Sequence, residues 1–439
     1  MKPGSRIQSA IEVLELVETT WAKKRSAPMD GLLNDYFKAR RYIGSKDRGA
    51  ISALVYEVLR HGAAIQWHLE LMNRAANPRR VVMAALVLCR KLGWEEVSAL
   101  FTGQKYAPAK IDDAERGTLQ KLEDMTLYDE RMPLPVRYNF PDWMEGRLTE
   151  AFGEKLPEEM AALNQEAPVD LRVNTLKCKS VADLIFALDK EGFTAAPTPH
   201  SPIGVRLQQR LPAFTTKPFQ EGWFEMQDEG SQIAALMVEA RPGDKVIDFC
   251  AGAGGKTLAI AATMQNKGRI LAWDNSAPRL KQMQKRLARA GVNNVMTHVI
   301  TGENDPFIKR HKDSADWVVV DAPCSGSGTW RRNPDLKWRF TPDDLREVKA
   351  LQASILASAA RLVRPGGRLV YITCSVFGDE NLHQIKQFIE SHARFRVAPV
   401  NKIWNKLAIE GSAMLPYLQL TPHQNGTDGF FAVVLTRQV

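Results

Sequence analysis

The second half of the chain alternates short apolar runs with amphipathic segments. The runs are rich in Val, Ile and Leu and are bounded by turn residues; in order they read DKVIDFCA, GRILAWD, NVMTHVI, DWVVVDAP and GRLVYITCS. Apolar residues at helical spacing fill most of the intervals, as at 277–290 and 343–363. Apolar strands separated by helices are typical of a parallel sheet that helices cover on both faces. We therefore predict a doubly wound, Rossmann-like α/β domain over residues 220–439.

The chain before this domain is predicted to contain two further parts. In DRGAISALVYEVLRHG, five apolar residues form one stripe of a helix, with Asp47 before them as a candidate N-cap: Ile51, Leu54, Val55, Val58 and Leu59. Similar segments predict an all-α domain over 1–130. Prolines then mark a linker that leads into a strand, a helix and a strand, so 131–219 is predicted to hold a linker and a small, RRM-like α/β unit. The fold class is a multi-domain α/β protein.

Composition limits the class of protein and its partners. The longest apolar stretch, VVMAALVLC, is far too short to span a membrane, and the five cysteines include no C-x-x-C pair that would indicate zinc or a disulfide framework. We expect a cytoplasmic monomer with no membrane or metal partner. The net charge of +9 favours a polyanionic partner without naming one.

The cations concentrate in two stretches, 279–291 and 329–340. The second sets arginines between tryptophans, and such residues can neutralise phosphates and stack on bases. We therefore predict that four of its residues contact nucleic acid: Trp330, Arg331, Arg332 and Lys337. The first stretch also fits the solvated face of an amphipathic helix.

A glycine-rich turn, DFCAGAGGKT, follows the first apolar run of the α/β domain. A phosphate-binding P-loop would need glycine at Cys250, and a dinucleotide fingerprint would need glycine at Thr257, so neither motif is present. Asp274 ends the second run, where a carboxylate can accept hydrogen bonds from ribose hydroxyls. This combination favours S-adenosylmethionine, with a nicotinamide enzyme as the competitor. A packing turn and a helix N-cap are the simpler interpretations of the glycines and of Asp274.

Two of the apolar runs end on cysteines, Cys324 and Cys374. If the two strands are neighbours, about 4.8 Å apart, both sulfurs reach one pocket. A thiolate nucleophile suits a substrate such as cytosine, because sulfur addition at carbon 6 makes carbon 5 able to attack a methyl sulfonium. Asp321, three residues before Cys324, could bind or protonate the ring edge. The alternative is that both thiols are buried structural cysteines.

Six motifs, together and in order, resemble the Sun (Fmu) family of RNA (cytosine-5) methyltransferases over 168–439: LRVNTLK, MQDEGSQ, DFCAGAGGKT, DAPCSGSGTWRRNPDLKW, YITCSVFGDEN and DGFFAVVL. The resemblance implies S-adenosylmethionine as cofactor. It also implies that Cys374 attacks the base and that Cys324 assists release of the product. Asp321, from its place beside Cys324, is the third predicted catalytic residue.

The family's cofactor contacts, carried over by motif, are Cys250, Ala251, Gly252, Ala253, Gly254, Gly255, Lys256, Asp274, Glu303 and Asp321. Two positions depart from the family pattern. Gly252-Ala253 stands where the family usually has Ala-Pro, and Glu303 stands where it has Asp, which puts the contact on the adenine side of the cofactor in question.

The helical region 1–130 more weakly resembles the NusB-like RNA-binding domain of the family's bacterial 16S rRNA methyltransferases. This points to RNA of the small ribosomal subunit as the partner. The catalytic motifs do not separate rRNA from tRNA, which other members of the family modify. A non-catalytic rRNA-binding scaffold is the alternative from a different class, against which the intact thiols and glycine turn argue.

Overall fold

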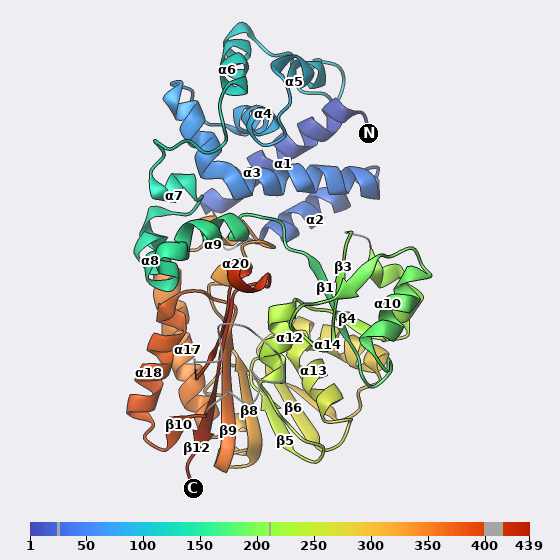
Figure 1. Ribbon diagram of the computed structural model, residues 1–439, viewed down its shortest axis with the longest axis vertical. Coiled ribbons are helices and arrows are strands. Elements are labelled where there is room, and N and C mark those ends of the chain that lie inside the picture. The colour runs from blue at the N-terminus through green and yellow to red at the C-terminus, as the bar shows by residue number, and fades with distance from the viewer. Residues whose placement is uncertain (24–26, 210–211, 399–415) are drawn as a thin grey trace. The chain divides into compact units, whose positions relative to one another are not determined.

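The computed structural model describes residues 1–23, 27–209, 212–398 and 416–439 (Figure 1). The chain forms two compact units: Met1–Gln165 with Trp330–Pro342, and Glu166–Thr329 with Asp343–Val439. The first unit therefore extends past the boundary predicted at residue 130. It also includes a stretch that the sequence pattern assigned to the α/β domain.

The first unit is all-helical. Its helices are α1 (Pro3–Lys23), α2 (Met29–Ala39), α3 (Ser45–Leu71), α4 (Pro78–Leu88), α5 (Trp94–Leu100), α6 (Asp113–Glu123), α7 (Leu134–Arg137), α8 (Glu145–Phe152), α9 (Leu156–Leu163) and α16 (Leu336–Arg339). The predicted stripe from Ile51 to Leu59 is buried on α3, as its spacing requires. The N-cap prediction was wrong: Gly44 caps α3, and Asp47 lies in its first turn, where it accepts a 2.7 Å hydrogen bond from Arg6.

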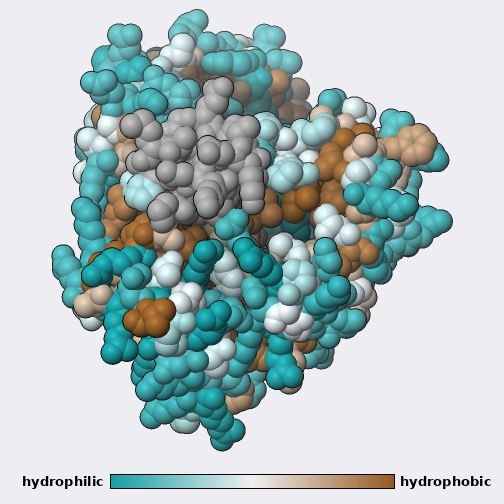
Figure 2. Space-filling model, turned by 60° about the horizontal axis from the view of Figure 1, so that its bottom comes forward, coloured by the Kyte–Doolittle hydropathy of each residue, from teal (hydrophilic) through white to brown (hydrophobic). Residues whose placement is uncertain are grey.

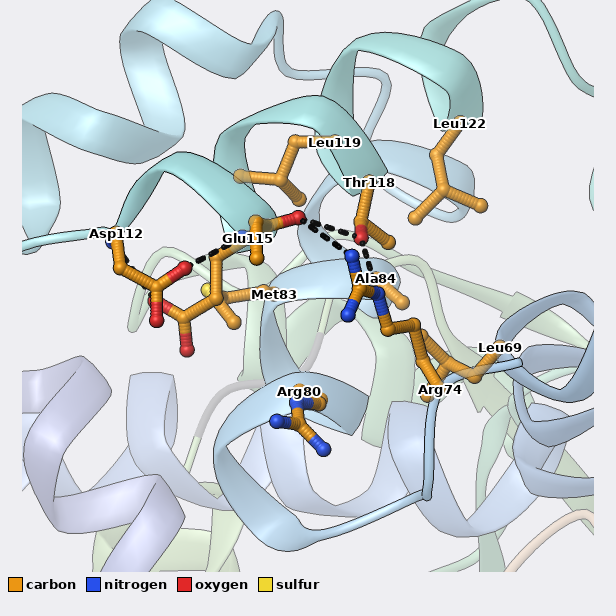
Figure 3. Close-up of a pocket in the computed structure, with 11 residues that line it drawn as sticks. Leu69, Arg74, Arg80, Met83, Ala84, Asp112, Glu115, Thr118, Leu119 and Leu122 are labelled. Carbon is orange, nitrogen blue, oxygen red and sulfur yellow. Dashed lines mark hydrogen bonds between the residues drawn. The ribbon is translucent and has the colours of Figure 1, made fainter. Parts of the chain in front are cut away.

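Helix α6 begins with a capping box. The Asp112 side chain accepts a hydrogen bond from the Glu115 amide at 2.7 Å, and Glu115 accepts one from the Asp112 amide at 3.2 Å. Beside it, Arg74 Nε donates to Thr118 Oγ1 at 3.3 Å (Figure 3). These side chains surround a cavity of only about 30 Å³, which has room for about one water molecule. The cavity is too small for a ligand.

The second unit contains two sheets. The smaller is antiparallel, in the order β2-β3-β1-β4, and has α10 (Val181–Asp189) and α11 (Lys217–Gln220) beside it. Its strands are β1 (Val169–Val173), β2 (Ala195–Pro197), β3 (Gly204–Leu207) and β4 (Phe224–Met226). Leu171 and Val205 from the sheet and Leu184 and Leu188 from α10 form its core. The small α/β unit predicted from the sequence is therefore present.

The larger sheet has the strand order β10-β12-β9-β8-β5-β6-β7, and β11 pairs with β12. Its strands are β5 (Lys245–Asp248), β6 (Arg269–Asp274), β7 (Val295–Val299), β8 (Ala315–Asp321), β9 (Val363–Thr373), β10 (Phe395–Val397), β11 (Leu418–Leu420) and β12 (Phe430–Arg437). The five apolar runs form the parallel strands β5 to β9, and β12 lies antiparallel between β9 and β10. The Rossmann-like prediction is confirmed.

Helices cover both faces of this sheet. Val246 packs with residues of α12 (Glu229–Leu236) and α13 (Gly255–Thr263), whereas its neighbour Ile247 packs with residues of α17 (Pro342–Ala360) and α18 (Leu382–Ser391). Figure 1 shows these two pairs of helices on opposite sides of the sheet. Helix α14 (Ala277–Ala290) packs Leu280 and Met283 against Ala272 of β6. The remaining short helices are α15 (Pro306–Lys309) and α20 (Pro422–Asn425). This arrangement leaves the carboxyl ends of the parallel strands as the place for a ligand site.

Among the described residues, no helix has both the length and the apolar content that crossing a membrane requires. On the face drawn in Figure 2, hydrophilic residues predominate and hydrophobic ones form smaller patches between them.

Candidate active site

The glycine-rich turn joins β5 to α13. Gly252 and Gly254 have φ values of +55° and +85°, which side-chain-bearing residues rarely adopt. At Gly254 a Cβ atom would also lie 2.5 Å from Met283 Cγ on α14, so this position has no room for a side chain. The turn thus packs closely on α14 and leaves its outer backbone facing the cavity beyond the strand ends.

Asp274, at the end of β6, holds the glycine-rich turn in place. It is buried, and its Oδ2 accepts a hydrogen bond from the Gly252 amide at 2.8 Å while Oδ1 accepts one from the Ser276 amide at 2.8 Å. A carboxylate has about four acceptor positions, so capacity remains for a ligand's hydroxyl groups. Asp274 therefore both supports the turn and lines the cavity.

The cavity at the strand ends has a volume of about 520 Å³ and lies within the second unit. This volume falls in the range of about 300–1,000 Å³ that is usual for small-molecule sites. Of the residues predicted to bind the cofactor, the structure places all but Gly254 in its lining, together with Cys324 and Cys374. Sequence reasoning missed several lining residues: Gln227, Asp248, Asn275, Arg279 and Arg286.

Asp248, the last residue of β5, is the most unusual of these. Its Oδ2 accepts a 2.6 Å hydrogen bond from Thr257 Oγ1, but its buried Oδ1 has no hydrogen-bond partner within the described part of the chain. Burial raises the pKa of Asp248 to about 7, although the Thr257 hydrogen bond opposes this shift. Its position directly before the glycine-rich turn was the signal that could have identified it.

Two arginines hold the carbonyl groups of the turn. Arg172, on β1 of the small sheet, is buried and donates from Nη1 to the Gly255 carbonyl at 2.6 Å and to Gln227 Oε1 at 2.7 Å. Burial lowers its pKa to about 10. Arg286 of α14 donates to the Ala253 carbonyl at 2.8 Å and pairs with Glu225 of β4 at 3.0 Å. The small sheet therefore supports the glycine-rich turn of the large one.

The two thiols lie next to each other. Strands β8 and β9 pair in parallel, with Asp321 opposite Ile372, so their following residues leave the sheet side by side. The sulfurs of Cys324 and Cys374 are 3.4 Å apart, and both are free thiols. The contact with Cys374 and burial hold the pKa of the Cys324 thiol well above its usual range. The prediction that the two strands are neighbours is confirmed.

The other predicted polar residues also reach this cavity. Lys256 Nζ donates to Asp321 Oδ2 at 2.6 Å, so the turn and the end of β8 are joined by an ion pair. Glu303 lines the cavity, while its Oε1 accepts a hydrogen bond from Ser354 Oγ at 2.9 Å. Glu303 is thus placed on the cavity wall by α17.

The structure argues against most of the predicted RNA contacts at 329–340. Trp330, Arg331 and Lys337 are buried, whereas Arg332 is partly exposed. Lys337 Nζ donates to Asn164 Oδ1 at 2.6 Å within the helical unit, and burial holds its pKa well below the usual value. A buried cation cannot meet a phosphate, so Trp330, Arg331 and Lys337 belong to the packing, and the partly exposed Arg332 stays a candidate for RNA contact.

Comparisons with known proteins agree with this geometry. Residues 235–436 match the family model of 16S rRNA methyltransferase RsmB/F, and residues 140–213 match the ferredoxin-like domain of RsmF/B-like methyltransferases.

Among curated proteins, a "Probable ribosomal RNA small subunit methyltransferase B" of Synechocystis is 32% identical over 414 residues, which cover 89% of this chain and 91% of the relative. The ribosomal RNA small subunit methyltransferase B of Salmonella newport is 30% identical, over 79% of this chain and 83% of its own. The crystal structure of PH0851 is similar with a TM-score of 0.75 and 27% identity, over 99% of both chains. On this evidence the chain belongs to the RsmB/F family of ribosomal RNA small subunit methyltransferases.

Proposed function

We propose that this protein transfers a methyl group from S-adenosylmethionine to carbon 5 of a cytosine in 16S rRNA. The observation that carries the proposal is the pair of free thiols, 3.4 Å apart, at the ends of two adjacent strands. They open onto the same cavity as the glycine-rich turn. One cavity therefore has both a place for a methyl donor and nucleophiles for a base.

The residues around the cavity fit S-adenosylmethionine, which would supply the methyl group as an electrophilic sulfonium. Asp274 would accept hydrogen bonds from the ribose hydroxyls, and the turn from Cys250 to Lys256 would hold the amino-acid end. Asp248 also lines this space, and its buried Oδ1 has no hydrogen-bond partner among the described residues. Glu303 is proposed for the adenine side.

The two thiols take different roles in this proposal. Cys374 adds to carbon 6 of the cytosine, which raises the electron density at carbon 5 for methylation. Cys324, as the thiolate, then accepts the carbon 5 proton, and the electrons of that C–H bond restore the C5=C6 double bond while the S–C6 bond breaks and Cys374 leaves as a thiolate. The motifs support this division of roles, because in the family that they resemble the thiol of the T-C-S motif, here Cys374, attacks the base and the thiol of the D-A-P-C motif, here Cys324, assists release.

Asp321 would position the base. Its carboxylate lines the cavity next to Cys324, and the ion pair with Lys256 fixes its direction. An ionised carboxylate accepts hydrogen bonds, so it suits the exocyclic amino group of cytosine, which only donates. Uracil carries a carbonyl oxygen at this position, and this difference would select against it.

The test is a methylation assay with labelled S-adenosylmethionine on 16S rRNA and on total tRNA, followed by bisulfite sequencing of both. We expect label and protected cytosines in 16S rRNA only. Protected cytosines in tRNA alone would move the substrate to tRNA. Cofactor binding by calorimetry without methylation of any RNA would favour the non-catalytic scaffold.

A further inference from the structure

A buried carboxylate lies behind the two thiol-bearing loops. Glu380 is fully buried, in the 3-10 turn Gly378–Glu380 that follows the second thiol. Its Oε2 accepts hydrogen bonds from the hydroxyls of Ser325 and Ser375, the residues directly after Cys324 and Cys374. One carboxylate oxygen thus bridges the two loops.

The other carboxylate oxygen fixes the Cys324 loop more closely. Oε1 accepts a hydrogen bond from the Ser325 amide at 2.8 Å and one from Gln352 Nε2 at 3.0 Å. The same Gln352 amide nitrogen donates to the Pro323 carbonyl at 2.9 Å. The backbone on each side of Cys324 is therefore held, either by Glu380 or by its partner on α17.

The Cys374 loop is held in the same cluster. Ser327 Oγ lies 3.0 Å from Ser375 Oγ, and the Gly328 amide donates to the Cys374 carbonyl at 2.9 Å. The Ser375 carbonyl accepts a hydrogen bond from Asn381 Nδ2 at 2.9 Å. The side chains that build this network are buried, so water does not compete for their hydrogen bonds: Ser325, Ser327, Gln352, Ser375, Glu380 and Asn381.

Burying the Glu380 carboxylate lowers the stability of the folded state, which a purely structural role does not require. Burial raises the pKa of Glu380 above its ordinary value, while hydrogen bonds from Ser325 and Ser375 act against that shift. Apolar side chains could fill the same volume without that cost. Glu380 does not line the cavity and so does not touch the substrate. Its contacts converge on the two residues that follow the thiols.

We propose that Glu380 is a positioning residue that holds the Cys324 and Cys374 loops together, so that both sulfurs reach one cytosine. The inference rests on the proposed function for its catalytic consequence, but the geometry itself can be tested without RNA.

The geometric test is the rate at which diamide joins Cys324 to Cys374. Diamide takes up the two protons and two electrons that two thiols release on forming a disulfide, and mass spectrometry of the linked peptides measures the product. Because reaction rates depend steeply on alignment, Glu380→Ala should slow this cross-link by about tenfold or more. Glu390→Ala, which removes an exposed carboxylate from the following helix α18, is the matched control and should cross-link like the wild type.

Glu380→Gln tests whether the loops need the hydrogen bonds of this side chain or its negative charge. Its amide oxygen can replace Oε1 and accept from Ser325 N and Gln352, while its amide group donates to the serine hydroxyls, which can turn to accept. This variant should therefore restore the cross-linking rate that Glu380→Ala loses. A variant with both Ser325→Ala and Ser375→Ala removes the bridge with little change in volume, and provides the test if Glu380→Ala does not fold.

Methyl transfer gives the second measurement. In Glu380→Ala the kcat should fall by about tenfold or more, whereas the KM for S-adenosylmethionine should stay within about threefold, because Glu380 has no contact with the glycine-rich turn. The proposal would be overturned if folded Glu380→Ala, or the double serine variant, kept both the cross-linking rate and the kcat of the wild type. So would a Glu380→Gln variant as defective as Glu380→Ala. A wild-type protein that methylates no RNA, but whose cross-linking still depends on Glu380, would refute the proposed function alone.

Discussion

The sulfur of Cys324 lies 3.4 Å from the sulfur of Cys374, although fifty positions separate them in the sequence. Parallel pairing of β8 with β9 brings them together, and the buried serine and glutamate side chains behind them fix the loops. A single base in the cavity can therefore meet both sulfurs, which makes the roles of the two thiols separable by mutation.

Replacing each thiol should give opposite effects on a covalent RNA complex. Cys374→Ala should abolish both methylation and the adduct, because the base is never activated. Cys324→Ala should leave attack possible but slow the release of product, so that enzyme accumulates on RNA. A denaturing gel with labelled 16S rRNA and S-adenosylmethionine should show a slowly migrating band for Cys324→Ala only.

The double variant is the control for this experiment, since it should lack the band if Cys374 forms the adduct. A band from Cys374→Ala that disappears when Cys324 is also replaced would reverse the roles. Methylation that survives in Cys374→Ala, with no band from either variant, would exclude the covalent mechanism.

Asp274→Ala should weaken cofactor binding and also loosen the glycine-rich turn. The carboxylate accepts hydrogen bonds from the Gly252 and Ser276 amides, so its loss removes supports for the turn as well as a ribose contact. Hydrogen bonds to a charged group are worth about 1.5–3 kcal/mol each, which corresponds to a loss of affinity of more than about tenfold. Calorimetric titration with S-adenosylmethionine measures this loss, and urea unfolding should show reduced stability. Unchanged affinity would mean that another residue holds the ribose.

The pKa of Asp248 predicts a pH dependence of stability. Because burial raises its pKa from 3.8 to about 7, the folded state binds the proton more tightly than the unfolded state. The contribution of this group is therefore fully present below about pH 4 and is lost as the pH rises through about 7. Asp248→Asn cannot titrate and can keep the Thr257 hydrogen bond. The free energy of unfolding of Asp248→Asn minus that of the wild type should thus increase from pH 4 to 8.

Urea unfolding of both proteins across this range, without cofactor, is the measurement. Since other groups titrate in both proteins, only the difference between the two curves reports on Asp248. A difference that stays constant with pH would show that the Asp248 carboxyl titrates alike in the folded and unfolded states.

The sequence predicted the parts of the site that local pattern determines. Alternating apolar runs and helices indicate the sheet, and a parallel sheet places Cys324, Cys374 and Asp274 at one edge because strand ends meet there. The bridge from Glu380 to the two serines and the contact of Arg172 with Gly255 were not predicted. They depend on which buried donors meet which acceptors after folding, and no periodicity in the sequence encodes that.

The stretch 330–342 shows why cation and tryptophan content alone did not predict RNA contacts correctly. Arginines, a lysine and tryptophans form the same pattern whether they face solvent or a neighbouring helix. Asn164, the partner of Lys337, lies 173 positions earlier in the chain, so its role is visible only in the fold.

The exposed cations of α14 are candidates for phosphate contact in the second unit. Arg279, Lys281 and Lys285 are exposed, whereas Arg286 of the same helix pairs with Glu225. If the three exposed cations neutralise phosphates, replacing all three with glutamine should reduce the slope of log K against log salt by about two units, at about 0.7 per single-strand contact. Filter binding of a 16S rRNA transcript across a salt series measures the slope. Lys337→Met is the matched control, because it removes a cation that is buried among helices and should leave the slope unchanged. An equal slope in the triple variant and the wild type would remove α14 from the RNA-binding surface.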